Sequence, residues 1–136
     1  FISASIGNRV ILRTVIKSQV NPLQKTLTCA QMDRILRVND LLRLLDEDIT
    51  PIAVSCFLFI ASRDGCHKQA MEEYLDLSTS TGSRNTDFLS PVHRLGKPGL
   101  NLIEKTQDPT NRRRSILTLT EKGRRLTTQI KRILDE

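Results

Sequence analysis

Three consecutive arginines, Arg112, Arg113 and Arg114, offer the clearest binding chemistry in this chain. A guanidinium group keeps its charge at neutral pH and presents several N–H donors, which suit phosphate oxygens and the narrow minor groove of DNA. The alternative is that the run forms a solvated loop tip with no ligand. The hairpin pattern that surrounds the run favours contact with nucleic acid.

A second polar group falls within a short segment that is predicted to be helical. It consists of Ser80, Ser83, Arg84, Asn85 and Thr86. Arginine and asparagine side chains read the edges of guanine and adenine with two hydrogen bonds, and hydroxyl groups hold phosphates. We therefore predict that these residues bind DNA, the alternative being an ordinary polar surface. The neighbouring Asp87 is expected to have a structural role or to disfavour wrong contacts.

Cys66 and His67 raise the question of a nucleophile beside a base. Adjacent residues on a helix point about 100° apart, and no third group that would orient the histidine is evident. The three cysteines show no CxxC pair and no ligand spacing with histidine, so the sequence predicts no metal site and no cofactor. We expect reduced thiols and no enzymatic activity. Oxidation of Cys29 or Cys66 as a switch stays open.

The composition is that of an ordinary soluble globular protein, with 38% hydrophobic and 26% charged residues. The formal net charge is +6, and the segment from Leu100 to Glu136 holds nine basic against five acidic residues, which favours an anionic partner. With no Trp and one Tyr, the chain lacks the aromatic residues of a single-strand binding platform. The longest apolar stretch, Ile52 to Ala61, is too short to cross a bilayer. We expect a cytoplasmic protein from a bacterium or a phage, without membrane contact.

Apolar residues recur with helical spacing in four segments that precede any strand pattern. The predicted helices run from about Cys29 to Leu45, from Thr50-Pro51 to Asp64, from His67 to Leu75, and from Ser78 or Thr79 to Leu89. Capping signals support two of them, because Thr28 and Gln31 form a capping box and Pro51 suits a first turn. The first helix carries more leucines than one small core needs, which predicts a partner helix.

A strand pattern replaces the helical pattern after Gly99. Leu100, Leu102 and Glu104 alternate with Asn101, Ile103 and Lys105, and a second alternating stretch runs from Ile116 to Leu119, beyond the segment from Gln107 to Arg114. The pattern predicts a two-stranded hairpin with the three arginines at its tip. Thr120 then caps a last helix, whose apolar face consists of Leu126, Ile130, Ile133 and Leu134. This order is typical of a winged helix-turn-helix, in which one helix enters the major groove and the hairpin reaches the adjacent backbone or minor groove.

Three stretches of the sequence resemble the wing signature of the multiple-antibiotic-resistance regulator (MarR) family. They are Gly99-Leu-Asn-Leu-Ile-Glu-Lys, Asp108-Pro-Thr-Asn-Arg-Arg-Arg and Leu117-Thr-Leu-Thr-Glu-Lys-Gly123. The resemblance covers about Ile52 to Leu134 and is most specific at the hairpin. It implies a homodimer of two winged-helix lobes joined by terminal helices, with each recognition helix in a major groove and each wing arginine at a minor groove. It also implies that Asp108 shapes the wing by pairing with Arg112 or Arg113.

The sequence departs from the family pattern at three places. Gly82 stands where the family usually has an apolar residue in the recognition helix, which weakens the helix by roughly 1 kcal/mol against Ala. The segment from Ser90 to Pro98 is several residues longer than the usual link to the wing. The chain ends soon after the helix that Thr120 begins, where the family commonly adds a dimerisation helix, and we expect the N-terminal segment to take that role. A leading segment is also expected ahead of Phe1.

The fold class that we expect is mainly α with a small β-hairpin wing, a winged helix-turn-helix with helical dimerisation arms. Residues 1–49 are expected to form an N-terminal dimerisation arm, residues 50–120 the DNA-binding domain, and residues 121–136 a C-terminal dimerisation helix. The predicted function is a homodimeric, sequence-specific regulator of transcription, a repressor, on double-stranded DNA. The alternative is a winged-helix module for protein–protein interaction, a replication accessory or anti-repressor, without specific DNA binding. Control by a small-molecule effector stays open, because few aromatic residues are present to line a pocket.

Overall fold

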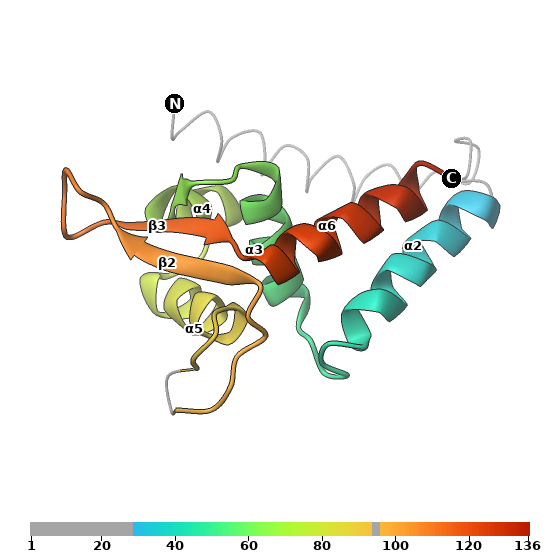
Figure 1. Cartoon of the computed structure of the whole chain (residues 1–136), viewed down its shortest axis with the longest axis horizontal. Helices are drawn as coiled ribbons and strands as arrows, with labels where there is room; N and C mark the ends of the chain where they lie inside the picture. Colours follow the sequence, from blue (N-terminus) through green and yellow to red (C-terminus); the bar gives the residue numbers. More distant parts are fainter. Residues whose placement is uncertain (1–28, 94–95) are drawn as a thin grey trace.

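The computed structural model describes residues 29–93 and 96–136 (Figure 1). Within these ranges the chain forms α2 (Cys29–Arg43), α3 (Pro51–Ser62), β1 (Cys66–His67), α4 (Lys68–Leu75), α5 (Thr79–Leu89), β2 (Ile103–Gln107), β3 (Ser115–Leu119) and α6 (Glu121–Leu134). The expected fold class is confirmed, because a mainly helical chain carries one small sheet near its C-terminal helix. Thr28 of the predicted capping box and most of the predicted arm 1–49 lie outside the described residues.

Side-chain caps fix where three of the helices begin. The hydroxyl of Thr50 accepts a hydrogen bond from the Ala53 amide at 3.2 Å, and Pro51 occupies the first turn of α3. Ser78 accepts from the Thr81 amide at 3.2 Å at the start of α5. Thr120 accepts from the Gly123 amide at 3.0 Å at the start of α6. Such caps satisfy amide groups that have no partner inside the helix, so they set the first residue of each element.

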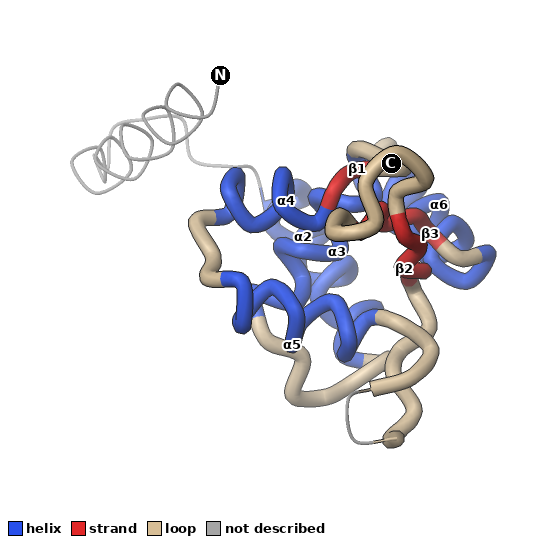
Figure 2. Tube along the Cα trace, turned by 90° about the vertical axis from the view of Figure 1, so that its left-hand side faces the viewer, coloured by secondary structure: helices blue, strands red, loops and turns tan. Residues whose placement is uncertain are grey.

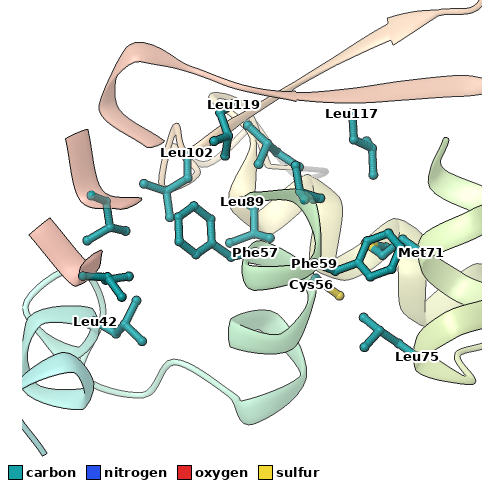
Figure 3. Close-up of a cluster of buried hydrophobic side chains, with 14 residues drawn as sticks. Leu42, Cys56, Phe57, Phe59, Met71, Leu75, Leu89, Leu102, Leu117 and Leu119 are labelled. Carbon is teal, nitrogen blue, oxygen red and sulfur yellow. The ribbon is translucent and has the colours of Figure 1, made fainter. Parts of the chain in front are cut away.

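The hydrophobic core is built around α3, as its predicted apolar face requires. Phe57 and Ile60 of this helix are fully buried, together with Met71 of α4, Leu89 of α5 and Leu117 of β3. Figure 3 shows these helices and the sheet contributing side chains to one continuous cluster around Phe57 and Leu89. The helix α5 and the hairpin of β2 and β3 are therefore both anchored to the same hydrophobic core.

The sheet has three strands in the order β1-β3-β2, all antiparallel. The hairpin of β2 and β3 was predicted, but β1 was not, because two residues are too few to show a period. The expected alternation from Leu100 to Lys105 is wrong: the strand begins at Ile103. Asn101 has a left-handed backbone, with φ of 55°, and the next two residues, Leu102 and Ile103, are both fully buried. The change of backbone conformation at Asn101 thus breaks the alternation between two strand faces that the sequence suggested.

The helices α2 and α6 lie at the end of the molecule opposite to the tip of the wing (Figure 1). They contact each other, and Arg37 of α2 forms an ion pair with Glu136 just beyond α6, with Nη2 and Oε1 3.0 Å apart. No helix among the described residues combines the length and hydrophobicity that a membrane crossing requires. The fold therefore separates a projecting hairpin from a pair of helices at the far end.

Candidate nucleic-acid interface

A tight turn joins α4 to α5 and forms the helix-turn-helix. Asp76 ends α4 in the left-handed conformation, with φ of 56°, and the Leu77 amide donates to the Glu72 carbonyl at 2.8 Å. Ser78 then caps α5. Figure 2 shows the loop from α4 to α5 at the end of α4 opposite to β1, with α5 below α4 in this view. The turn thus presents one full face of α5 outside the core.

Gly82 is the contact point at which α5 approaches α4. A methyl group at this position would overlap the carboxylate side chain of Glu72, which is itself buried. Glu72 forms an ion pair with Lys68 one turn earlier in α4. The departure from the family pattern at Gly82 therefore has a steric reason, because the glycine makes room for a charged pair between the two helices.

The outer face of α5 carries Ser80 and Arg84, and both side chains are exposed. They are four residues apart and so lie on one side of the helix. Ser83 is half-buried and faces the wing. These three predicted residues are therefore available to a ligand that approaches α5 from outside.

Thr86 and Asn85 are less accessible than the sequence suggested. Thr86 is fully buried, and its hydroxyl donates to the Gly82 carbonyl at 2.9 Å, so the predicted DNA contact at Thr86 is wrong. The half-buried Asn85 donates its amide N–H to the Thr81 carbonyl at 2.8 Å. Its surface faces a cleft that it shares with Asp46 and Asp48, on the side of α5 away from the wing.

Asp108 organises the tip of the wing through both carboxylate oxygens. Oδ1 accepts from the Thr110 backbone amide at 2.9 Å and from the Thr110 hydroxyl at 2.7 Å. The Asp108 amide donates to the Arg114 carbonyl at 3.0 Å and closes the base of the tip. These hydrogen bonds tie the Asp108 side chain to the loop at the tip of the wing, which is consistent with the role that the family resemblance implies for this residue.

The predicted partner of this carboxylate is wrong. Oδ2 of Asp108 lies 2.9 Å from Nε2 of His67, at the end of β1, and no ion pair with Arg112 or Arg113 occurs among the described residues. Hydrogen bonds from the Thr110 hydroxyl, from His67 and from the Thr110 amide hold the pKa of Asp108 well below its usual range. From the sequence, His67 is a candidate only for a base beside Cys66. It lies 41 residues before Asp108 in the chain. No local pattern in the sequence signals such a contact.

The three wing arginines are all exposed. Arg113 and Arg114 face α5, whereas Arg112 does not border the space between the wing and the helices. Arg113 and Arg114 line the same groove as Glu72 and Asp87, yet neither arginine forms an ion pair with a described residue. The structure therefore separates two arginines on the helix side from one on the other side.

A groove of about 470 Å³ lies between the two helices of the helix-turn-helix and the wing. We call it the wing groove. Its lining is polar and combines four cations, two carboxylates, an amide and three hydroxyl groups: Lys68, Gln69, Glu72, Thr79, Ser83, Asp87, Lys105, Arg113, Arg114 and Ser115. An open groove of this chemistry suits a phosphate backbone better than an apolar small molecule.

The cysteines are free and offer little reactivity in the core. Burial, together with the nearby Glu72 carboxylate, raises the pKa of the Cys56 thiol to about 11, and burial also raises the pKa of Cys66. A raised pKa disfavours the thiolate, which is the nucleophilic form. No group of three His, Cys, Asp or Glu side chains that could hold a metal ion occurs within residues 29–93 and 96–136.

Comparison with known proteins gives structural neighbours but no relatives by sequence alone. No protein-family model and no curated protein sequence matches the chain. The crystal structure of MarR is 24% identical and has a TM-score of 0.56, covering 85% of this chain and 77% of that one. The MepR–DNA complex of S. aureus is 19% identical with a TM-score of 0.62, covering 76% of this chain and 77% of that chain.

A third neighbour is the transcriptional repressor CouR bound to a 23-mer DNA duplex. It is 25% identical, with a TM-score of 0.54, and covers 86% of this chain and 78% of that one. The chain thus has the winged helix-turn-helix fold of the MarR-family transcriptional regulators.

Proposed function

We propose that this protein is a transcriptional regulator, a repressor, that binds specific sites on double-stranded DNA. The observation that carries the proposal is that Ser83 of α5 lines one polar groove together with Arg113 and Arg114 of the wing. Ser80 and Arg84 are exposed on the outer face of the same helix. A helix with exposed Arg and Ser residues suits the major groove, while Arg113 and Arg114 suit the adjacent minor groove or backbone. In this arrangement Ser83 lies at the groove side of the helix, and Asn85 is a peripheral contact.

Three further observations support DNA as the partner. The formal net charge is +6, and a basic surface attracts a polyanion. The neighbours MepR and CouR were solved with DNA. The neighbours are transcriptional regulators rather than enzymes, and burial raises the pKa of the Cys66 thiol, which disfavours the nucleophilic thiolate. We infer a non-enzymatic, cytoplasmic protein of bacterial or phage origin.

We infer that the functional unit is a homodimer formed through the arms. Met32, Ile35 and Leu36 of α2 share one side of the helix and are each about half exposed, at 52%, 49% and 56%. Leu134 of α6 is 50% exposed at the same end of the molecule. A second copy of the chain is the occupant we propose for this stripe, since pairing two lobes lets two recognition helices reach successive major grooves. Residues 1–49 and 121–136 then serve as dimerisation arms around the DNA-binding domain 50–120.

Binding of the wild-type protein to labelled duplexes tests the proposed function. Fluorescence anisotropy is measured at several salt concentrations with a mixed-sequence duplex and with the DNA that flanks the protein's own gene. We expect binding to both, a steep loss of affinity with salt because counterions are released, and tighter binding to the flanking DNA. Absence of binding at low salt contradicts the proposal and favours the protein-interaction module instead.

A further inference from the structure

Two of the four cations in the wing groove are already held by carboxylates. Lys68 forms an ion pair with Glu72 on the same helix, and Lys105 of β2 forms one with Asp87 of α5. The Lys105 and Asp87 side chains are 26% and 22% exposed, so a ligand in the groove reaches this pair. Arg113 and Arg114 enter no ion pair within the described residues, and they supply the uncompensated positive charge.

The position of Asp87 places a negative charge where a DNA strand is expected. Asp87 lies on the same side of α5 as Ser83, one turn away, and Thr79, two turns away, and all three border the groove. A phosphate in the groove is repelled by the Asp87 carboxylate, which also neutralises the Lys105 charge that would otherwise attract the phosphate. Asp87 therefore cancels one positive charge on the proposed DNA-binding surface.

The stability of the fold does not account for this pair. Partly exposed ion pairs contribute little to folding, because solvent screens the charges and two long side chains lose freedom. The connection between α5 and the wing is already provided by Leu89, Ile103 and Leu117, which are fully buried in the common core. A repulsive element at a binding surface is, by contrast, a general means of rejecting weak or wrong partners.

We propose that Asp87, by holding Lys105, limits sequence-independent phosphate binding in the wing groove and so makes the protein more selective for its site. The proposal rests on the proposed function, because it assigns a role in DNA binding. Asp87 is a specificity-determining residue in this account, and Lys105 is the cation that it restrains.

Three variants test the proposal on a mixed-sequence duplex, for which no cognate site is needed. Asp87→Asn removes the carboxylate, and Asp87→Asn with Lys105→Gln removes both charges. Glu104→Gln is the matched control, because Glu104 is exposed on the same strand, next to Lys105, and its loss changes the net charge by the same amount. Thermal melting of each variant checks that the fold is retained, and salt-dependent anisotropy gives affinity and slope.

We expect Asp87→Asn to bind the mixed-sequence duplex about threefold to tenfold more tightly at low salt, with a salt slope steeper by about one, because one more phosphate contact forms. The double variant should lose this gain, and Glu104→Gln should show a much smaller one. Lys105→Gln alone should reduce the slope by less than Arg113→Ala does, since Lys105 is engaged in the wild-type protein.

Two results overturn the proposal. If Asp87→Asn binds the duplex no more tightly than the wild type, the Lys105–Asp87 pair has a structural role only. An equal gain in Glu104→Gln assigns the effect to net charge. Failure of the proposed function is distinguished by the wild-type protein, which then binds no duplex at any salt concentration.

Discussion

One carboxylate, that of Asp108, connects the tip of the wing to the first strand of the sheet. It accepts hydrogen bonds from the Thr110 amide and hydroxyl and lies 2.9 Å from the His67 ring nitrogen. Bonds of this kind stabilise the ionised form, so the pKa of Asp108 lies well below its usual range. At neutral pH the charged carboxylate therefore holds the loop on which the three arginines stand.

The pH dependence of folding follows from the sign of this shift. Because the pKa is lower in the folded than in the unfolded protein, Asp108 stabilises the fold above the unfolded pKa of about 3.9, and this contribution is lost as the pH falls below it. The difference in free energy of unfolding between the wild type and Asp108→Asn should be largest near neutral pH and shrink below about pH 4. Urea unfolding across this range measures it, with the exposed Asp40→Asn as control. A difference that stays constant with pH contradicts the assignment.

The sequence predicted single residues well where the local pattern was sufficient. The exposed Arg84 and the exposed wing arginines stand where the helix and hairpin patterns placed them. The prediction that Thr86 binds DNA was wrong, because helical spacing alone does not tell which side of a helix meets the core. Thr86 lies one turn after Gly82, on the side of α5 that packs against α4. The pair of His67 and Asp108 could not be predicted, because the register of β1 on β3 brings the two residues together.

The close approach of α4 and α5 depends on one glycine. A glycine inside an α-helix normally lowers the stability of the helix by roughly 1 kcal/mol relative to alanine. In this protein a side chain at position 82 would overlap Glu72, which is held in the interface by Lys68. Packing between the two helices therefore outweighs the higher helix propensity that alanine would have at position 82.

Gly82→Ala should lower the thermal stability of the wild-type protein, although alanine is the better helix former. In a Glu72→Ala background, where the overlapping side chain is absent, the same substitution should stabilise the protein by up to about 1 kcal/mol. Thermal melting of the two single variants and the double variant gives this comparison. A stabilising effect of Gly82→Ala in the wild-type background contradicts the steric account.

The helices and the hairpin were predictable because each spans several periods of its pattern. The predicted Cys29 to Leu45 helix corresponds to α2, which ends at Arg43, and the predicted recognition helix corresponds to α5. The two-residue β1 and the left-handed Asn101 were not predictable, since both are fixed by contacts with distant parts of the chain. Both determine how the hairpin is positioned on the core. The sequence therefore predicted the hairpin but not the way in which it packs on the rest of the domain.

In the molecule as a whole, the surfaces proposed for DNA contact and for self-association are far apart. The wing and the exposed side of α5 lie at one end, and the apolar stripe of α2 lies at the other (Figure 1). A stripe of half-exposed Met, Ile and Leu side chains is costly to leave in water, and a symmetric partner would bury it.

The dimer is expected to depend on this stripe. Light scattering should give the mass of a dimer for the wild type at tens of micromolar and of a monomer for Ile35→Asp combined with Leu36→Asp, because buried charges disfavour association. Thr106→Asp, at an exposed position on the wing strand β2, is the control and should stay dimeric. A monomeric wild type at this concentration contradicts the prediction.

The salt dependence of DNA binding by a wing variant tests the central claim most directly. Affinity for a mixed-sequence duplex is measured at several salt concentrations for the wild type, for Arg113→Ala with Arg114→Ala, and for Lys131→Ala with Arg132→Ala on the exposed side of α6. We predict that the wing variant binds more weakly and that its slope is shallower by about two, one for each lost phosphate contact. Its melting temperature should be unchanged, because exposed charges contribute little to stability. The α6 variant, with the same loss of charge, should keep the wild-type slope. A wing variant with the affinity and slope of the wild type would contradict the account and leave the wing as a surface loop.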